Sequence, residues 1–330
     1  MMIIKIRGYK VKKTSVFALI ICLISTVYAQ EEKKTQVLNA AILSGPSCIP
    51  VCKIVENPVI DDIQINFEKF VTPQNLLPKL VKKEIDLAFL PVNVAAKVFN
   101  TANKNIVCLA VTGNGNIFLI TKDTKVNKIS DLSGKKVQVA GQGATPDYLF
   151  RYLLQQNEIN DNEIFLDYSV PNAQIAAQLI SGKIDYAVVP EPFVTIAKTK
   201  SKDVRVAVDF QQEYKFFSDG NQNYPLTVMI ARKEFAQNNQ EIIDKFLKEY
   251  EKSLEWTLKN PAAAGKLCET LDFSLAANVV AKSIPNSNYT FIRAVEAKTQ
   301  IEELLTIFMN LDKASVGQVL PSDDFYFSVN

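Results

Sequence analysis

The feature that most restricts the fold of this chain is the alternation of short apolar segments with amphipathic helical ones. Between residues 37 and 232, most apolar runs are followed by a segment with helical periodicity. This order is typical of a parallel α/β architecture, with helices on both faces of each sheet. The expected strands are 37–43, 63–70, 86–90, 106–112, 117–122, 136–140, 164–170, 185–189, 204–210 and 226–232. The expected helices are a first one that ends near 57, then 73–83, 92–100, 145–157, 172–181 and 193–200, and an entirely helical remainder after residue 240, at 241–259, 261–271, 274–283 and 291–311.

One of these units occurs twice. Residues 80–91 and 179–190 match at five of twelve positions with a constant offset of 99, and both contain a helix end, a turn, a buried strand and a proline. The alternative explanation of this match is that any α/β unit favours Ile-Asp at the point where the chain enters a strand. The repeat itself favours two similar lobes. Because the strand at 226–232 follows the second copy, we expect two Rossmann-like lobes joined by a two-segment hinge. Lobe 1 is then 30–115 and 220–330, and lobe 2 is 116–219.

The N-terminal segment, residues 1–29, is expected to be a signal peptide. It carries five basic residues, no acidic one, and an apolar run at 16–24, which is shorter than the roughly 20 residues of a membrane-spanning helix. Cleavage after Ala29 would export the mature protein to the periplasm. Cys22 leaves a lipid anchor as an alternative, although Ile21 stands where a small residue is wanted. Without this segment the net charge of +2 becomes −3, because 32 basic residues face 35 acidic ones.

The four remaining cysteines leave two interpretations open. Cys48 and Cys52 are four residues apart, on one face of a helix, whereas Cys108 and Cys268 have no near partner in the sequence. An oxidising compartment allows a Cys48–Cys52 disulfide, but buried free thiols are the simpler interpretation. The two-residue spacing usual for zinc is missing, so we expect neither a metal site nor a cofactor.

Four loops after predicted strands are the candidate ligand-binding segments: 44–48, 91–93, 141–147 and 190–193. In open α/β sheets the ligand lies beyond the carboxyl ends of the strands, where helix N-termini offer free N–H donors. Glycine, proline and capping residues also simply end strands and start helices, which is the alternative for each loop. Their corresponding places in two lobes favour a binding crevice. The candidate residues are Ser44, Gly45, Ser47, Cys48 and Asn93 from lobe 1, Gln142, Gly143, Ala144, Thr145, Tyr148 and Glu191 from lobe 2, and Asp219 in the return segment.

Composition and motifs exclude several functions. The chain has no histidine, which rules out Ser–His–Asp and Cys–His hydrolysis, HExxH zinc proteases and histidine proton shuttles. The loop at 141–147 lacks both the third glycine of a dinucleotide fingerprint and the Gly-Lys-Ser/Thr of a phosphate loop. A net charge of −3 without a basic aromatic stripe gives no support to nucleic-acid binding.

Several motifs together resemble the substrate-binding proteins of nitrate/sulfonate/taurine-type ABC importers. They are Gly45-Pro46-Ser47 and the segments 86–91, 131–137, 141–146 and 185–192. The resemblance spans about residues 36–327 and implies a type II periplasmic-binding-protein fold that closes on a small molecule. It also implies a membrane permease with its ATPase as the partner. We expect a monomer without catalytic activity.

Two alternatives stay open: a fold-related enzyme of cofactor biosynthesis, and an exported ligand sensor without a transport role. The pyrimidine synthases among those enzymes use a histidine as a reactant, and this chain has none. For the ligand, Glu191 near helix N-termini predicts a zwitterion or a heteroaromatic ring with N–H donors, because a bare inorganic anion would be repelled by that carboxylate. A vitamin precursor or an amino-sulfonate-like solute fits this expectation.

Overall fold

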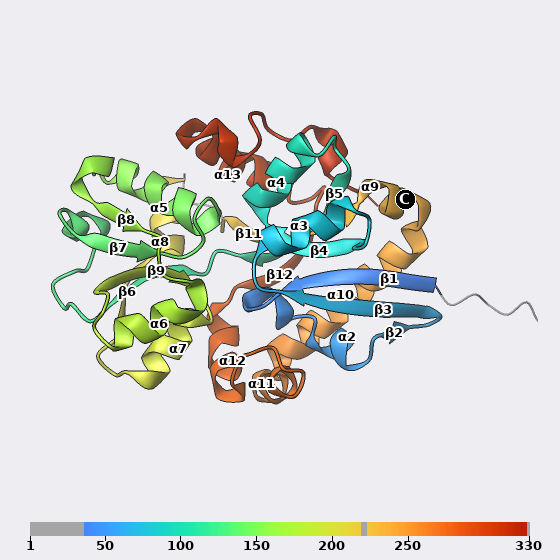
Figure 1. Ribbon diagram of the computed structural model, residues 1–330, viewed down its shortest axis with the longest axis horizontal. Helices are drawn as coiled ribbons and strands as arrows, with labels where there is room; N and C mark the ends of the chain where they lie inside the picture. Colours follow the sequence, from blue (N-terminus) through green and yellow to red (C-terminus); the bar gives the residue numbers. More distant parts are fainter. Residues whose placement is uncertain (1–35, 219–222, 329–330) are drawn as a thin grey trace, which may run out of the picture. The chain divides into compact units, whose positions relative to one another are not determined.

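Two β-sheets, each covered by helices on both faces, form the framework of the protein (Figure 1). The structure is a computed structural model that describes residues 36–218 and 223–328, apart from the side chain of residue 161. The predicted signal peptide, 1–29, lies outside the described residues, as does Asp219.

The larger sheet has seven strands within the described residues, in the spatial order β12-β5-β11-β4-β1-β3-β2. The strand predicted to return to the first half of the chain does so, because β11 lies between β4 and β5 and pairs antiparallel with both. β1 and β4 are parallel. The bounds are β1 Gln36–Leu43, β2 Val59–Ile60, β3 Ile63–Phe70, β4 Leu87–Pro91, β5 Ile106–Asn114, β11 Pro225–Arg232 and β12 Tyr289–Arg293.

The smaller sheet has the order β10-β6-β9-β7-β8 among the described residues. Here β7 is parallel to β8 and β9, whereas β6 is antiparallel to β9 and β10. Both sheets are therefore mixed, and the prediction of parallel sheets was wrong in this respect. The bounds are β6 Ile117–Thr121, β7 Lys136–Val139, β8 Phe165–Asp167, β9 Tyr186–Pro190 and β10 Arg205–Asp209.

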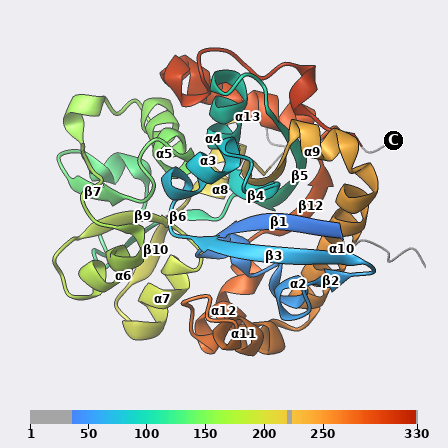
Figure 2. The ribbon, with the colours of Figure 1, turned by 45° about the vertical axis from the view of Figure 1, so that its right-hand side comes forward.

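The sheets are buried on both faces because successive side chains along a strand point to opposite sides. In β4, Leu87 and Phe89 belong to one apolar core, while Ala88 and Leu90 belong to another. In Figures 1 and 2, α3, α4 and α13 lie on one side of the larger sheet, and α2, α11 and α12 lie on the other. The bounds of the α-helices are α2 Cys52–Glu56, α3 Pro73–Val81, α4 Val92–Thr101, α5 Thr145–Gln156, α6 Asn172–Ile180, α7 Phe193–Lys200, α8 Phe210–Phe217, α9 Lys233–Asn238, α10 Gln240–Lys259, α11 Pro261–Thr270, α12 Ala277–Ser283 and α13 Lys298–Leu311. Short 3-10 helices are η1 Pro46–Cys48, η2 Ile129–Leu132, η3 Asp161–Glu163, η4 Ile284–Asn286, η5 Lys313–Ser315 and η6 Asp323–Phe325.

The repeated segment occupies equivalent places in the two sheets. In each copy a helix, α3 or α6, leads into a strand that ends in proline, β4 or β9, and a further helix follows. Each of these strands has a parallel neighbour on one side and an antiparallel neighbour on the other. The sequence repeat thus corresponds to a repeat of structure.

Two segments connect the sheets, and they lie side by side. The chain leaves the larger sheet between Asn114 and Ile117 and returns between Phe217 and Pro225. The backbone N–H of Gly115 donates to the carbonyl of Tyr224 at 2.9 Å, which joins the outgoing and the returning segment. This arrangement is the predicted two-segment hinge between two α/β lobes. The boundaries predicted for the lobes, at 115/116 and 219/220, stay predictions.

Several predicted elements were wrong. Residues 289–293 form β12, which pairs with β5, so the chain after residue 240 is not entirely helical. The last predicted helix begins at Lys298 instead of residue 291. The helix expected to end near residue 57 is split into η1 and α2, and α8 was not expected at all. Residues 289–293 are mostly aromatic or β-branched, and the predicted helix included part of this run. They form a strand because they pair with β5 at the edge of the larger sheet.

Candidate functional site

A small hollow lies where the connecting segments meet the larger sheet. We call it the hinge hollow. Its walls come from η1, the end of β5, the start of β11, α10 and the residues around the start of β12. The lining residues are Pro46, Ser47, Pro50, Thr112, Gly113, Asn114, Asn116, Leu226, Thr227, Tyr250, Ser287 and Tyr289. The free space inside is about 10 Å³, close to what a single water molecule requires. An organic ligand therefore fits only if the walls of the hollow move apart.

Two asparagines of the outgoing segment carry unpaired oxygens in this hollow. Asn116 is 2% exposed, and its Nδ2 donates to the carbonyl of Ser287 at 3.0 Å. This contact fixes the orientation of the carboxamide, because only the nitrogen can donate. Oδ1 of Asn116 and Oδ1 of Asn114 have no hydrogen-bond partner among the described residues. Buried acceptors without a partner are rare in folded proteins, so both oxygens would gain from a hydrogen-bond donor that reaches them when the walls of the hollow move apart.

The first predicted loop contributes one side chain to the hollow. Gly45 has φ of +119°, a conformation that favours glycine, and Pro46 starts η1 directly after it. Ser47 lines the hollow and donates its hydroxyl proton to the carbonyl of Leu43 at 2.9 Å. Ser44 is exposed, and its backbone N–H donates to the carbonyl of Phe70.

Cys48 lies in the apolar core beneath this loop, where it is 1% exposed. Its thiol donates to the carbonyl of Gly45 at 2.9 Å, and burial raises its pKa to about 12. Cys48, Cys52, Cys108 and Cys268 are buried free thiols in the structure. Cys52 lies against Cys268 and Thr257. No three histidine, cysteine, aspartate or glutamate side chains of the described chain are arranged to hold a metal ion.

The second and third predicted loops meet each other across the lobes. Asn93, at the start of α4, is fully buried and donates from Nδ2 to the carbonyl of Gly143 at 2.9 Å. Its Oδ1 accepts from the hydroxyl of Thr145 at 3.3 Å. Ala144 is half-buried in the same loop, and Gln142 is exposed. Asn93 of the second loop thus binds Gly143 and Thr145 of the third loop directly.

Asp147, the last residue of the predicted loop 141–147 and not among the candidate residues, holds the third loop in place. One carboxylate oxygen accepts from the backbone N–H of Gly143 at 2.9 Å. The other accepts from Arg151 at 2.7 Å and from Tyr168 at 2.6 Å. Gly143 has φ of +72°, and the carboxylate fixes this left-handed turn from inside the following helix.

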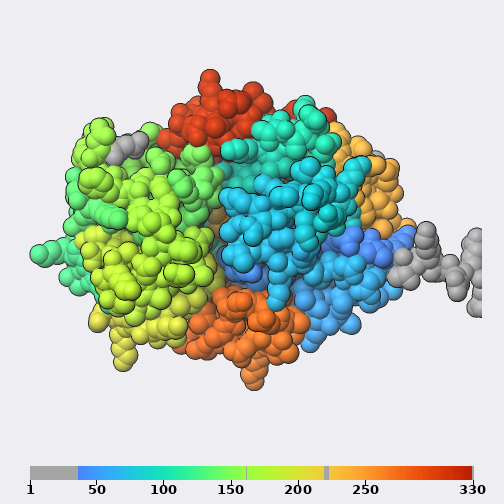
Figure 3. Space-filling view, in the orientation of Figure 1, coloured from blue at the N-terminus to red at the C-terminus, as the bar shows by residue number. Residues whose placement is uncertain are grey.

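Tyr148 joins the lobes at their other edge. Its hydroxyl donates to Asp312 at 2.8 Å, and its ring packs on Phe308 of α13 with 5.5 Å between centroids. Burial and the neighbouring carboxylate raise the pKa of Tyr148. Tyr148 therefore contributes to lobe contact, and it does not line the hinge hollow. Figure 3 shows the seam along which the green and yellow lobe 2 meets the cyan and orange parts of lobe 1.

Glu191 is 2% exposed, and its carboxylate is occupied by the first turn of the helix that follows it, α7. One oxygen accepts from the backbone N–H of Thr195 and the other from the Thr195 hydroxyl, both at 3.0 Å. Desolvation raises the pKa of Glu191. Its backbone N–H donates to the carbonyl of Asn116, which ties the start of α7 to the hinge. A contact between the Glu191 carboxylate and a ligand stays a prediction, and Asp219 lies outside the described residues.

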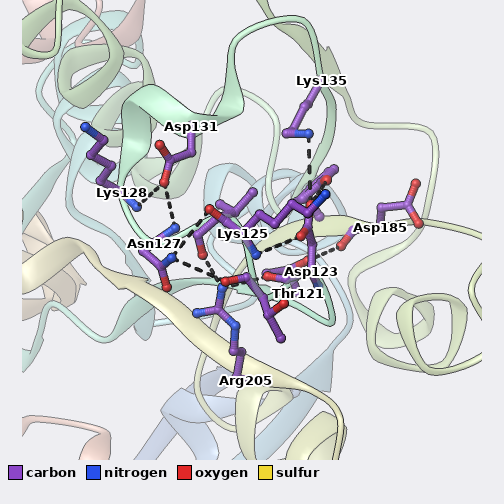
Figure 4. Close-up of polar contacts among 12 residues, drawn as sticks. Thr121, Asp123, Lys125, Asn127, Lys128, Asp131, Lys135, Asp185 and Arg205 are labelled. Carbon is purple, nitrogen blue, oxygen red and sulfur yellow. Dashed lines mark hydrogen bonds and ion pairs between the residues drawn. The ribbon is translucent and has the colours of Figure 1, made fainter.

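The Ser-Asp-Leu-Ser-Gly-Lys segment, 130–135, is far from the hollow along the sheet. Figure 4 shows Asp131 accepting hydrogen bonds from the backbone N–H groups of Asn127 and Lys128, at 2.8 and 3.1 Å. The bond from Asn127 is the main reason why the pKa of Asp131 is lowered. This network follows Thr121, the end of β6 remote from the hinge. The segment thus caps η2 and serves the fold of lobe 2.

Two α/β lobes, joined by two adjacent segments and closing on a hollow at the hinge, define the type II periplasmic-binding-protein fold. A family model described as the NMT1-like family matches residues 27–272, well over half of the chain. The chain belongs to the NMT1-like family, which confirms the resemblance found in the sequence. No curated protein sequence matches the chain. Among the described residues, no helix combines the length and apolarity needed to cross a membrane.

Solved structures share the fold. An ABC transporter protein from Parabacteroides distasonis has a TM-score of 0.76 and 24% identity, over 89% of this chain and 100% of the other. The periplasmic aliphatic sulphonate-binding protein of Escherichia coli has a TM-score of 0.68 and 19% identity, over 87% and 92%. The periplasmic nitrate-binding protein of Synechocystis PCC 6803 has a TM-score of 0.67 and 15% identity, over 89% and 84%.

Proposed function

We propose that the protein is a receptor that binds one small organic solute between its lobes and delivers it to an ABC-type importer. The observation that carries this proposal is the position of the hinge hollow, against the outgoing segment and the start of β11, where the returning segment enters the larger sheet. Rotation of one lobe about such a hinge opens or closes a site at that place. The NMT1-like family and the named functions of the structural neighbours support the proposal.

The remaining parts of the proposal follow from the same family. The receptor works as a monomer in the periplasm, after cleavage of the segment at 1–29, and presents its ligand to a cognate permease with its ATPase. Lobe 1 is 30–115 with 220–330, and lobe 2 is 116–219. Neither the binding nor the delivery of a solute requires a catalytic step. Vitamin precursors, other heteroaromatic solutes and amino-sulfonate-like solutes are the ligand classes to examine first.

In this proposal the predicted site residues have two roles. Ser47 contacts the ligand in the hinge hollow, together with Asn114 and Asn116, which the sequence analysis missed. Asn93 and Thr145 bind each other in the closed form and become accessible when the lobes separate. The polar Gly-Asn-Gly-Asn run at 113–116 was the signal in the sequence, since it separates two apolar strands without a helix between them.

Isothermal titration calorimetry and small-angle X-ray scattering on purified mature protein test the function. Pyrimidines, flavins, sulfonates and amino acids are titrated, and scattering is recorded with and without the tightest-binding compound. We expect one compound to bind at a single site and to reduce the radius of gyration, because the lobes must open for entry and close afterwards. A saturating ligand that leaves the radius of gyration unchanged would contradict lobe closure.

A further inference from the structure

We propose that the hinge hollow selects a hydrogen-bond donor, an N–H or O–H group on an uncharged or cationic part of the ligand, and disfavours oxyanions. This inference rests on the proposed receptor function and names the ligand chemistry of the same site.

The two carboxamides provide the first argument. Nδ2 of Asn116 uses one of its two N–H groups on the carbonyl of Ser287, while its buried Oδ1 is an acceptor without a partner among the described residues. Oδ1 of Asn114 is a second buried acceptor that has no partner in the described part of the chain. A buried acceptor gains most from a donor, because it has lost its hydrogen bonds to water. An N–H or O–H group restores that bond.

The hydroxyl groups of the lining point the same way. Four of them already donate their proton to a backbone carbonyl: Ser47 to Leu43, Thr112 to Thr227, Ser287 to Ser283 and Tyr289 to Pro46, at 2.9, 3.3, 2.8 and 3.0 Å. A hydroxyl has one proton, so what these groups can still offer an occupant is oxygen lone pairs. These four of the six lining hydroxyls, the others being those of Thr227 and Tyr250, therefore present acceptors to the hollow.

Among the described residues that line the hollow, none is charged. A nitrate or sulfonate group has only acceptor oxygens and would face the acceptors of Asn114 and Asn116 without a compensating positive charge. An N–H group would meet the same oxygens favourably. The chain shares the fold of proteins named for sulphonate and nitrate binding, whereas the hollow proposed here disfavours such oxyanions.

Matched small probes test this inference by calorimetry. Taurine and ethanesulfonate differ by one ammonium group, and cytosine and nitrate represent a neutral donor-bearing ring and a bare oxyanion. We expect cytosine to bind more tightly than nitrate, and taurine to bind about tenfold more tightly than ethanesulfonate, which corresponds to one added hydrogen bond. Asn116→Ala and Asn114→Ala are each expected to weaken the tighter-binding probe of each pair by about tenfold. Asn160→Ala, which removes an exposed carboxamide bound to Glu163, is the control and should change nothing.

The outcomes separate this inference from the function. If ethanesulfonate or nitrate binds as tightly as its donor-bearing partner, or if both asparagine variants leave binding unchanged, the inference is wrong and the receptor function stands. If no probe and no compound of the wider panel binds, the receptor function fails with it, and an ordered water molecule suffices to occupy the hollow. Circular dichroism of each variant confirms that a lost affinity does not reflect unfolding.

Discussion

Asn93 is the residue whose removal should change lobe closure most directly. It is fully buried at the start of α4 in lobe 1, and its carboxamide binds Gly143, in the loop before α5, and Thr145, the first residue of α5, in lobe 2; Nδ2 also lies 3.5 Å from the carbonyl oxygen of Ser315 in lobe 1. Nδ2 reaches the carbonyl of Gly143 at 2.9 Å, and Oδ1 accepts from Thr145 at 3.3 Å. Alanine at this position removes both contacts and leaves their partners free to bind water when the lobes separate.

The size of the effect follows from these two bonds. Each is worth about 1 kcal/mol net, so their loss favours the open form by about 2 kcal/mol. This free energy corresponds to a factor of about 30 in the equilibrium between open and closed forms. We expect Asn93→Ala to lower ligand affinity by up to about 30-fold, because binding must then also supply the free energy of closure.

Calorimetry measures the affinity, and small-angle scattering measures the radius of gyration with and without ligand. Asn100→Ala is the matched control. It removes a carboxamide from the same helix that donates to the carbonyls of Val316 and Val319, both at 2.7 Å and both in lobe 1. The control should lower the melting temperature without changing affinity or compaction. If Asn93→Ala behaves like this control, the contact across the lobes does not govern closure.

Two further predictions concern the hinge and a buried acid. Gly115→Ala places a methyl group 2.1 Å from the ring of the buried Tyr224. We expect this clash to lower the free energy of unfolding, measured in urea, by at least about 2 kcal/mol. Gly113→Ala, whose methyl group would lie 4.0 Å from the nearest atoms of Thr227, should have little effect. Because desolvation raises the pKa of Glu191 above its ordinary value of 4.5, the folded state holds the proton more tightly, and stability should fall as the pH rises from about 4.5 through the folded pKa. Glu191→Gln, which does not titrate, should flatten that part of the pH profile.

The predictions for the glycine variants and for Glu191→Gln can each be contradicted by unfolding measurements. Equal unfolding free energies for the two glycine variants would mean that the connecting segments move apart without cost. Unfolding free energies of Glu191→Gln that run parallel to those of the unchanged protein across the acidic range would mean that the carboxylate is well solvated in the folded state.

Local chemistry explains why most elements were predictable. Helix α7, Phe193–Lys200, and strand β3, Ile63–Phe70, have the bounds that the apolar periodicity predicts. The repeat at 80–91 and 179–190 revealed two equivalent units, because equal burial requires similar side chains at equivalent positions. β12 was missed because a five-residue strand at the edge of a sheet is stabilised by pairing with its neighbour. That neighbour, β5, lies far away in the sequence.

The candidate site was predictable only in part, since the sequence marks which loops follow strands but not what each side chain bonds. Glu191 and Cys48 have the chemistry of ligand-binding groups, yet one is occupied by Thr195 and the other by the carbonyl of Gly45. Asn114 and Asn116 were not among the predicted site residues, because a short polar run between two strands has the same composition as an ordinary turn.

Periodicity, repeats and motifs were enough to predict the α/β class, the two similar lobes, the return of the chain at 226–232 and the family, because all three are local properties of the sequence. Tertiary structure decided which polar groups remain unpaired. Hydrogen-bond satisfaction depends on partners such as Ser287 and Asn116, which are far apart in the sequence and meet only when the hinge brings β5, β11 and β12 together.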